Sequence, residues 1–549
     1  MPAAGFQPAW PPERRLRPRL AAPPSLLWNR PWDRPLSQLF RTKSIDALIK
    51  ASEEPDKRLR KTLGPWSLTA FGVGAVIGSG IFILTGTAAA GETLRNTSIL
   101  HATVLDLILH GPHALSMLGR PGAGPGISLS FLLTAVCCGF AALCYAELAS
   151  MIPIAGSAYT YAYATLGEII AWIIGWDLIL EYAVSNMAVA VGFSAYFNDI
   201  LKYFFTSSWF VHTRLFGWQL PGKISNPTFA SSGPTGWFNL PALVILLILT
   251  YILVRGVKES ANTNNVMVAV KIAAILIFVI GAAHAVKSEN WHPFLPNGFP
   301  GVLTGAAIVF FTYIGFDSVS TAAEECKNPQ RDLPLGIIAT LVICAVLYIS
   351  VSLVLTGIAS YTTLNNAAPV AKALENLNMN GIRVWVSIGA IVGMLSSLLV
   401  FQYGQARIWF AMSRDGLLPR LFARIHPRHK TPYISTWIAG LVVGIPAGIW
   451  DIGTFADLAN IGTLFAFIVV SAGVIVLRKQ QPDRPRGFRV PGSPFLPGLS
   501  IASCLVLMMA LPVETWLRFF IWLAIGFGIY FPFGRKNSVL RRENAEAAA

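Results

Sequence analysis

The chain has 549 residues, of which 54% are hydrophobic and only 13% are charged. These proportions exclude a soluble protein of ordinary composition and indicate a polytopic helical membrane protein. The net charge of +15 would suggest nucleic acid as a partner, but the positions of the basic residues argue against it. With the N-terminus inside, 31 of the 42 Lys and Arg residues fall in cytoplasmic segments and 9 in outer segments. This asymmetry predicts a multi-pass protein with both termini cytoplasmic and the basic charge facing anionic lipid. We expect it in the plasma (inner) membrane.

The first 65 residues are expected to form a basic cytoplasmic arm. Residues 1–36 are rich in Pro, Arg and Trp without helical periodicity, so they are either disordered or upstream sequence read from an early start codon. The apolar spacing within residues 37–63 is typical of a short interfacial helix. We expect no disulfide and no metal site, because no Cys or His spacing suggests one.

The first apolar segment, residues 66–90, reads WSLTAFGVGAVIGSGIFILTGTAAA and carries no charge. Its length suits a membrane span, but Gly78, Ser79 and Gly80 lie at its centre. Glycines here allow the helix to break and to leave N–H groups free, which lipid tolerates only beside protein or a polar cavity. The alternative is that Gly74 and Gly78 form a close-packing GxxxG face.

Residues 91–126 are predicted to be an extracellular insertion. Its apolar section, residues 99–109, is too short to span a membrane and is expected to form a surface helix. His101 and His110 are interpreted as solvated loop residues rather than metal ligands.

The remaining apolar segments predict eleven further spans, which makes twelve in all. They lie at about 127–152, 164–197, 238–256, 262–285, 300–323, 334–358, 383–411, 434–450, 456–477, 493–511 and 515–533. Five spans in residues 66–290 followed by five in 291–480 predict an inverted repeat with a binding site at mid-membrane. Two more helices in 481–533 and a cytoplasmic tail, 534–549, complete the chain.

The sixth span tests this symmetry. In VLTGAAIVFFTYIGFDSVSTAAEE, residues 302–325, Gly315 stands beside Phe316 and Asp317 within the apolar stretch. A glycine next to an acidic residue at this depth predicts an interrupted helix. Both halves are therefore expected to open with a broken helix.

The segments GAVIGSGIFILTG, FFTYIGFDSVSTAAEE and RIWFAMSRDGLLP resemble the amino acid–polyamine–organocation (APC) superfamily. The chain is most similar to bacterial members of its cationic amino acid transporter branch, from about residue 40 to residue 535. The resemblance implies an all-α fold with a LeuT-like core of five plus five inverted helices, in which helices 1 and 6 are broken. Residues 1–36 and 91–126 depart from the family pattern.

The resemblance also implies a substrate site at the two breaks. The substrate carboxylate is expected on free N–H groups at Ile77, Gly78, Ser79 and Gly80. The ammonium group is expected on carbonyls at Phe310, Phe311 and Ile314. Opposite helix ends present opposite partial charges to the two ends of a zwitterion. Met394 would cap the side-chain pocket and favour small or medium apolar side chains, unless it merely fills the core.

Lys271 is the most informative ionisable residue, because it lies about 14 Å into its span at ~1.5 Å per residue. A lysine cannot snorkel that far. In proton-coupled relatives, a lysine at the matching place replaces the cation of sodium-coupled ones, with Ser396 and Ser397 nearby. The alternative is a fixed structural cation tied to backbone carbonyls.

Three carboxylates lie in apolar spans. Glu181 and Asp317 are candidate proton relays or simple hydrogen-bond acceptors, whereas Asp177 is interpreted as structural. Glu147, Glu324 and Glu325 lie near cytoplasmic ends and are expected to pair with inner-loop bases such as Arg414 or Lys327.

The predicted function is secondary active transport, namely proton-coupled uptake of small or medium neutral L-amino acids by alternating access. Alternatives are an amino acid exchanger, a cationic amino acid uniporter, or a transport-inactive nutrient sensor. We expect no enzyme activity, because the chain has no nucleotide loop and no HExxH motif. The expected partners are the amino acid, protons and the bilayer, with no cofactor beyond a proton gradient. A small membrane subunit is left open.

Overall fold

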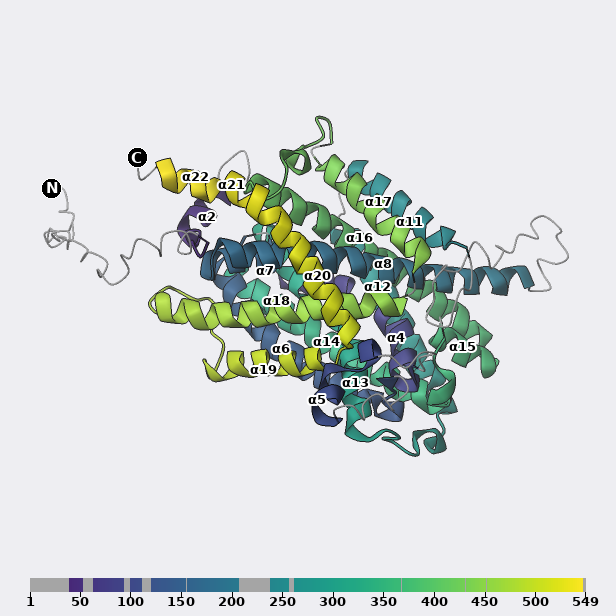
Figure 1. The fold of residues 1–549 in the computed structure, drawn as a ribbon. Helices are drawn as coiled ribbons and strands as arrows, with labels where there is room; N and C mark the ends of the chain where they lie inside the picture. The colour runs from purple at the N-terminus through teal and green to yellow at the C-terminus, as the bar shows by residue number, and fades with distance from the viewer. Residues whose placement is uncertain are drawn as a thin grey trace, which may run out of the picture.

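The computed structural model describes residues 39–52, 63–92, 99–110, 120–154, 156–206, 237–255, 261–366, 368–429, 431–450 and 452–546. These residues form a helical bundle in which the long helices α8 (Glu168–Thr206) and α18 (Ile452–Gln480) run side by side (Figure 1). The predicted disorder of residues 1–36 lies outside the described residues.

The elements of the first half include one two-stranded antiparallel sheet. They are α2 (Ile45–Ser52), α3 (Pro65–Val76), α4 (Ser79–Ala90), β1 (Gly91–Glu92), η1 (Ile99–His101), α5 (Val104–His110), β2 (Arg120–Pro121), η3 (Gly124–Gly126), α6 (Ile127–Met151), α7 (Ser157–Thr165), α8, α11 (Leu240–Arg255), α12 (Ala261–Ala282), η4 (Ala283–Ala285) and η5 (Ser288–Trp291).

The described elements of the second half are helical. They are α13 (Gly298–Val309), η6 (Phe310–Tyr313), η7 (Phe316–Glu325), α14 (Pro329–Ile358), η8 (Tyr361–Thr363), α15 (Pro369–Asn376), α16 (Asn380–Arg414), η9 (Arg420–Ala423), α17 (Tyr433–Ile449), α18, α19 (Phe495–Met509), α20 (Val513–Ile529), the π-helical turn η10 (Tyr530–Gly534), α21 (Arg535–Asn537) and α22 (Val539–Glu546).

The described residues contain eight helical segments that are long and apolar enough to cross a membrane, and the bent pair α3 and α4 makes a ninth. Three shorter apolar helices, α11, α17 and α19, fall at three further predicted spans. The chain is therefore a polytopic all-α membrane protein, and the count of twelve spans stays a prediction. The short helix α7, between the second and third predicted spans, was not expected from the sequence.

The first predicted span breaks where its glycines lie. Helix α3 ends at Val76, α4 begins at Ser79, and their axes differ by 46°. The sixth predicted span is interrupted at Ile314, which has an extended backbone, and at Gly315, whose φ of +116° is unfavourable for any residue with a Cβ. Both interruptions agree with the sequence-based expectation.

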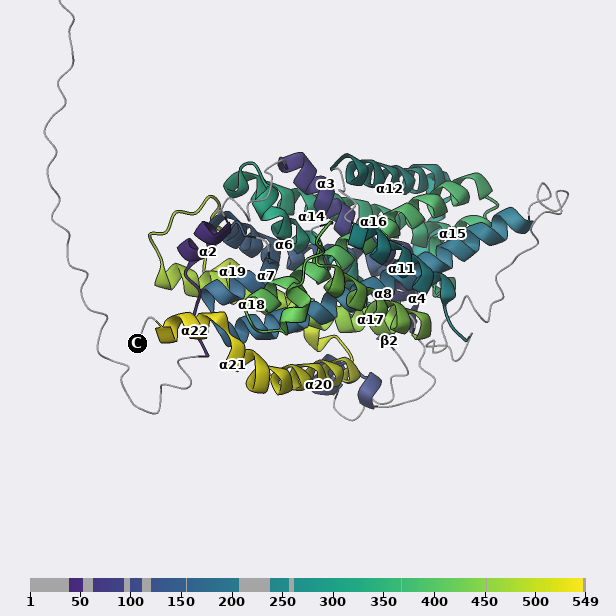
Figure 2. The same ribbon diagram turned by 90° about the horizontal axis from the view of Figure 1, so that it is seen from above.

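Contacts between helices link the two halves of the chain. Helix α6 packs against α14, and α8 packs against both α16 and α18 (Figure 2). Helix α3 lies against α14, α12 and η7. The two interrupted segments are therefore enclosed by helices from both halves, in a place consistent with an inverted repeat.

The described part of the 91–126 insertion is tied to the bundle. Strands β1 and β2 pair directly after α4, and Arg120 of β2 forms a bidentate ion pair with Asp457 of α18 at 2.9 and 2.6 Å. His101 lies 3.3 Å from the Glu514 carboxylate. The predicted surface helix is divided into η1 and α5, which begins only at Val104.

Glu147 anchors the connection between α18 and α19. Its carboxylate accepts hydrogen bonds from Arg478 at 2.9 and 2.5 Å, from Arg486 at 3.2 Å and from the Val490 N–H at 2.7 Å. Glu147 thus pairs with basic residues of a predicted inner loop, as expected, but these are Arg478 and Arg486 rather than Arg414 or Lys327. Arg407 instead lies 3.7 Å from Glu325.

We expect Glu147→Gln to destabilise the protein. Glu147 is 1% exposed, and loss of one member of a buried ion pair typically costs about 3–5 kcal/mol because the remaining charges stay desolvated. Thermal unfolding of the purified protein in detergent measures the effect as a lower Tm.

Asp46→Asn provides the matched control. Asp46 also pairs with an arginine of the same connection, Arg484, at 2.7 Å, but its side chain is 82% exposed. An exposed pair contributes little, so its loss should leave Tm unchanged. Equal Tm values for the two variants would contradict an anchoring role for Glu147.

Candidate functional site

A buried lysine donates hydrogen bonds to backbone carbonyls at the end of α3. The Lys271 Nζ donates to Gly74 O at 2.7 Å and to Ile77 O at 3.0 Å. The Lys271 side chain is 0% exposed, which agrees with its predicted depth in α12. Since a helix that stops leaves its last carbonyls without helical N–H partners, the ammonium group supplies the donors that they lack.

Serines of α16 bind the same carbonyls. The Ser397 hydroxyl lies within 3.2 Å of Gly74 O, Ala75 O and Ile77 O, and Ser396 Oγ lies 3.4 Å from Gly74 O. Lys271, Ser396 and Ser397 thus reach the same carbonyl of Gly74, which agrees with the expectation that the two serines lie near the lysine.

The N–H groups at the start of α4 form the donor side of the break. Ser79 and Gly80 are its first two residues, so their N–H groups have no partner within the helix. The Ser79 hydroxyl is buried and, among the described residues, unpartnered. The structure differs from expectation at two positions, because the N–H of Ile77 donates to Val73 O and that of Gly78 donates to Val76 O.

The second break supplies the acceptor side. Phe310 and Phe311 lie in the tight turn η6, where Phe311 O accepts the Ile314 N–H at 3.3 Å. Each of these carbonyls has a second lone pair for another donor. Ile314 lies between η6 and η7, and within the described chain its carbonyl accepts no hydrogen bond. Ile314 is thus the most available of the three predicted acceptors.

The two breaks touch each other. A Cβ added to Gly80 would lie 2.7 Å from Thr312 Cγ2 and 3.0 Å from Thr312 Cα. One added to Gly315 would lie 3.1 Å from Ala75 Cβ. Only glycine permits these approaches, so donors at the start of α4 and acceptors at Ile314 belong to one site.

Tyr348 of α14 joins the breaks and was missed from the sequence. Its hydroxyl lies 3.1 Å from Val76 O and 3.0 Å from Thr312 O, one carbonyl from each interrupted span. The side chain is fully buried. The only signal in the sequence is a tyrosine in an apolar span, whose hydroxyl must find a partner when buried.

Met394 lies beside the first break. It is 0% exposed, and its Sδ and the Ser79 Cβ both lie close to Gly192 of α8, at 3.5 and 2.7 Å from the position of an added Cβ. Met394 is therefore placed where it could line the substrate pocket, and the same position also fits a side chain that only fills the core.

The three carboxylates form a separate buried group, and none of them contacts Lys271 among the described residues. Asp317 Oδ2 accepts a hydrogen bond from Ser157 Oγ at 3.3 Å. Glu181 Oε2 and both oxygens of Asp177 have no hydrogen-bond partner among the described residues. Asp177 therefore resembles Glu181 more than was expected.

The arrangement suits a small molecule with an anionic and a cationic end. Free N–H groups and the positive end of α4 suit the anion, and the Ile314 carbonyl suits the cation. No cluster of three or more metal-binding side chains occurs in the part of the chain that the structure describes.

Comparison with known proteins agrees with these observations. The amino acid permease family model matches residues 63–530. The chain is 45% identical to a methylthioribose transporter of Bacillus subtilis over 507 residues, which are 92% of this chain and 100% of the relative. It is also 45% identical to the branched-chain amino acid permease BcaP of the same organism, over 92% and 99% of the two chains.

A more distant relative is the chloroplastic cationic amino acid transporter 9 of Arabidopsis thaliana, which is 38% identical over 78% of this chain and 68% of the relative. The family match covers both interrupted spans and Lys271. The chain therefore belongs to the amino acid permease family of the APC superfamily and is a membrane transporter rather than an enzyme.

Proposed function

We propose that the protein couples inward proton movement to the uptake of small or medium neutral L-amino acids by alternating access. The observation that supports this most directly is the fully buried Lys271 ammonium on the Gly74 and Ile77 carbonyls. In this proposal Lys271 carries the coupled proton, and Glu181 and Asp317 relay protons to and from the site. We place both termini on the cytoplasmic side of the plasma (inner) membrane.

The substrate carboxylate binds the N–H groups of Ser79 and Gly80 together with the Ser79 hydroxyl. The ammonium group binds the Ile314 carbonyl, with Phe310 and Phe311 as further acceptors. Ile77 and Gly78 contribute N–H groups only if the first break rearranges, because both are occupied in this conformation. Met394 bounds the side-chain pocket.

A second candidate substrate comes from the relatives. The methylthioribose transporter and the branched-chain permease are equally similar to this chain at 45% identity. Methylthioribose has neither a carboxylate nor an ammonium group, so it would leave the α4 N–H groups without a charged partner. The geometry therefore favours the amino acid, and a competition assay with methylthioribose decides between them.

Lys271→Ala tests proton coupling. In liposomes, the wild type should accumulate labelled alanine or valine when an inward proton gradient is imposed. The variant should lose this accumulation while still exchanging preloaded substrate, because the proton carrier is gone while the substrate-binding groups are unchanged and Ser397 still lies within hydrogen-bond distance of the Gly74 and Ile77 carbonyls.

Lys372→Ala is the control, because the Lys372 side chain is 54% exposed and forms its ion pair with Glu375, three residues along the same helix. It should behave as the wild type. If wild-type uptake is the same with and without the gradient, Lys271 is a structural cation and the protein is an exchanger or a uniporter.

Gly80→Ala tests the contact between the breaks. The new methyl group would overlap Thr312, and overpacking of a tight contact costs about 1–3 kcal/mol. Uptake of labelled substrate should fall about tenfold or more. Gly139→Ala in α6 is the matched control, since its nearest neighbour lies 3.9 Å away. Equal uptake by the two variants would show that the breaks need no close approach.

Met394→Ala tests the selectivity pocket. With a smaller side chain at this position, larger or cationic amino acids should compete about tenfold better for uptake of the labelled substrate. This is the usual change in discrimination when a hydrophobic pocket gains room for one or two methylenes. Met412→Ala on the same helix is also fully buried but packs against Gly175, away from the breaks. A similar change in both variants would assign Met394 to core packing alone.

A further inference from the structure

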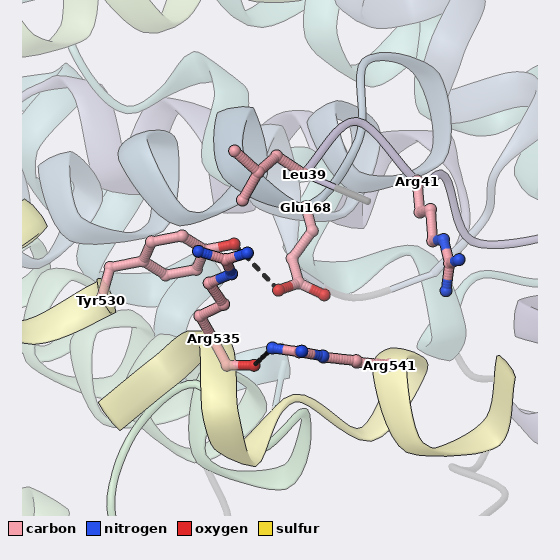
Figure 3. Close-up of a pocket in the computed structure, with 6 residues that line it drawn as sticks. All are labelled: Leu39, Arg41, Glu168, Tyr530, Arg535 and Arg541. Atoms are coloured by element: carbon pink, nitrogen blue, oxygen red, sulfur yellow. Dashed lines mark hydrogen bonds between the residues drawn. The ribbon is translucent and has the colours of Figure 1, made fainter. Parts of the chain in front are cut away.

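A basic pocket lies at the end of the bundle that holds α2 and α22 (Figures 1 and 2). Side chains from three separate stretches of the chain line it, as Figure 3 shows: Leu39, Arg41, Glu168, Tyr530, Arg535 and Arg541. None of these residues takes part in the proposed transport site. By the distribution of Lys and Arg, this end faces the cytoplasm.

The one carboxylate of the pocket is already bound by hydroxyl groups. Glu168 accepts hydrogen bonds from Tyr163 at 3.1 Å, Tyr530 at 3.0 Å and Ser538 at 2.5 Å. Glu168 is 5% exposed and lies at the first turn of α8. It makes no ion pair with a guanidinium group among the described residues, so it does not neutralise the arginines directly.

The three arginines are without a carboxylate partner in the described part of the chain. Arg41 and Arg535 are half-buried, and Arg541 is exposed. The Arg541 side chain is held in place at the pocket, because its Nη1 donates to the Arg535 carbonyl at 3.2 Å (Figure 3). Three guanidinium groups around one carboxylate leave a local excess of positive charge.

The walls of this pocket are fixed by backbone hydrogen bonds. The N–H of Glu168 donates to Arg41 O at 3.0 Å, and that of Ile169 donates to Leu39 O at 2.9 Å. On the other side, the Val539 N–H donates to Asp415 O at 3.1 Å. Both segments that carry the arginines are thus held by backbone hydrogen bonds to the rest of the bundle.

We propose that this pocket binds a phosphate group, supplied by the head of an anionic phospholipid or by a soluble phosphate. Guanidinium groups bind phosphate oxygens through paired, charge-assisted hydrogen bonds, and three of them line this pocket. Basic pockets at the cytoplasmic ends of membrane helices are suited to lipid head groups.

The test measures the Tm of the purified protein in a neutral detergent with three additives. These are dioctanoyl phosphatidylglycerol, dioctanoylglycerol, which lacks the phosphate, and inorganic phosphate at constant ionic strength. A ligand of the folded state raises Tm in a concentration-dependent manner. Arg541→Gln should weaken the affinity for the phosphate-bearing ligand about tenfold, since a charge-assisted pair is lost.

Arg542→Gln is the matched control, because it removes the same charge one residue farther along α22. Arg542 donates to Asn537 and does not line the pocket. Stabilisation by phosphatidylglycerol that needs Arg541 but not Arg542 supports a lipid site. The same dependence with inorganic phosphate alone supports a soluble phosphate source. The proposal is overturned if neither ligand raises Tm, if dioctanoylglycerol does so equally, or if both variants respond alike.

Discussion

The structure depends on how the backbone of an interrupted membrane helix finds hydrogen-bond partners. Between α3 and α4 the helical ladder stops, and lipid offers no water to replace it. Lys271 and Ser397 supply donors from two other helices to the carbonyls of Gly74, Ala75 and Ile77. Helices α3, α12 and α16 therefore meet at the break. Because Lys271 and Ser397 satisfy the carbonyls at the end of α3, the helix can stay interrupted there, and the N–H groups at the start of α4 remain free.

The second break is stabilised by backbone conformation and by one hydroxyl. Gly315 provides the positive φ, and Ile314 provides a carbonyl that accepts no other hydrogen bond in the described chain. Tyr348 lies within hydrogen-bond distance of a carbonyl from each break, so its single proton can be shared between them. Movement of one interrupted span relative to the other must change this contact, as well as that between Gly80 and Thr312.

Local patterns in the sequence predicted much of this fold and site. Apolar runs predict most of the long helices within a few residues. Gly78, Gly80 and Gly315 mark the breaks, where Gly315 adopts a positive φ and Gly80 lies close against Thr312. The partners of Glu147, Tyr348 and Lys271 are set by packing between distant segments. No local pattern indicates that Glu147 meets Arg478 and Arg486, or that the Ile77 and Gly78 N–H groups turn back onto α3.

The contact between Lys271 and the first break gives the proposed proton coupling a physical basis. A charged ammonium group makes hydrogen bonds roughly twice as strong as those of a neutral amine. Two such bonds hold the end of α3 to α12, at 2.7 and 3.0 Å. Loss of the proton would weaken both hydrogen bonds and leave the packing of the side chain unchanged. It would thereby favour any conformation in which α3 separates from α12. A proton can shift an equilibrium only through such a difference between states, and in the proposed coupling the carbonyls of Gly74 and Ile77 would provide it.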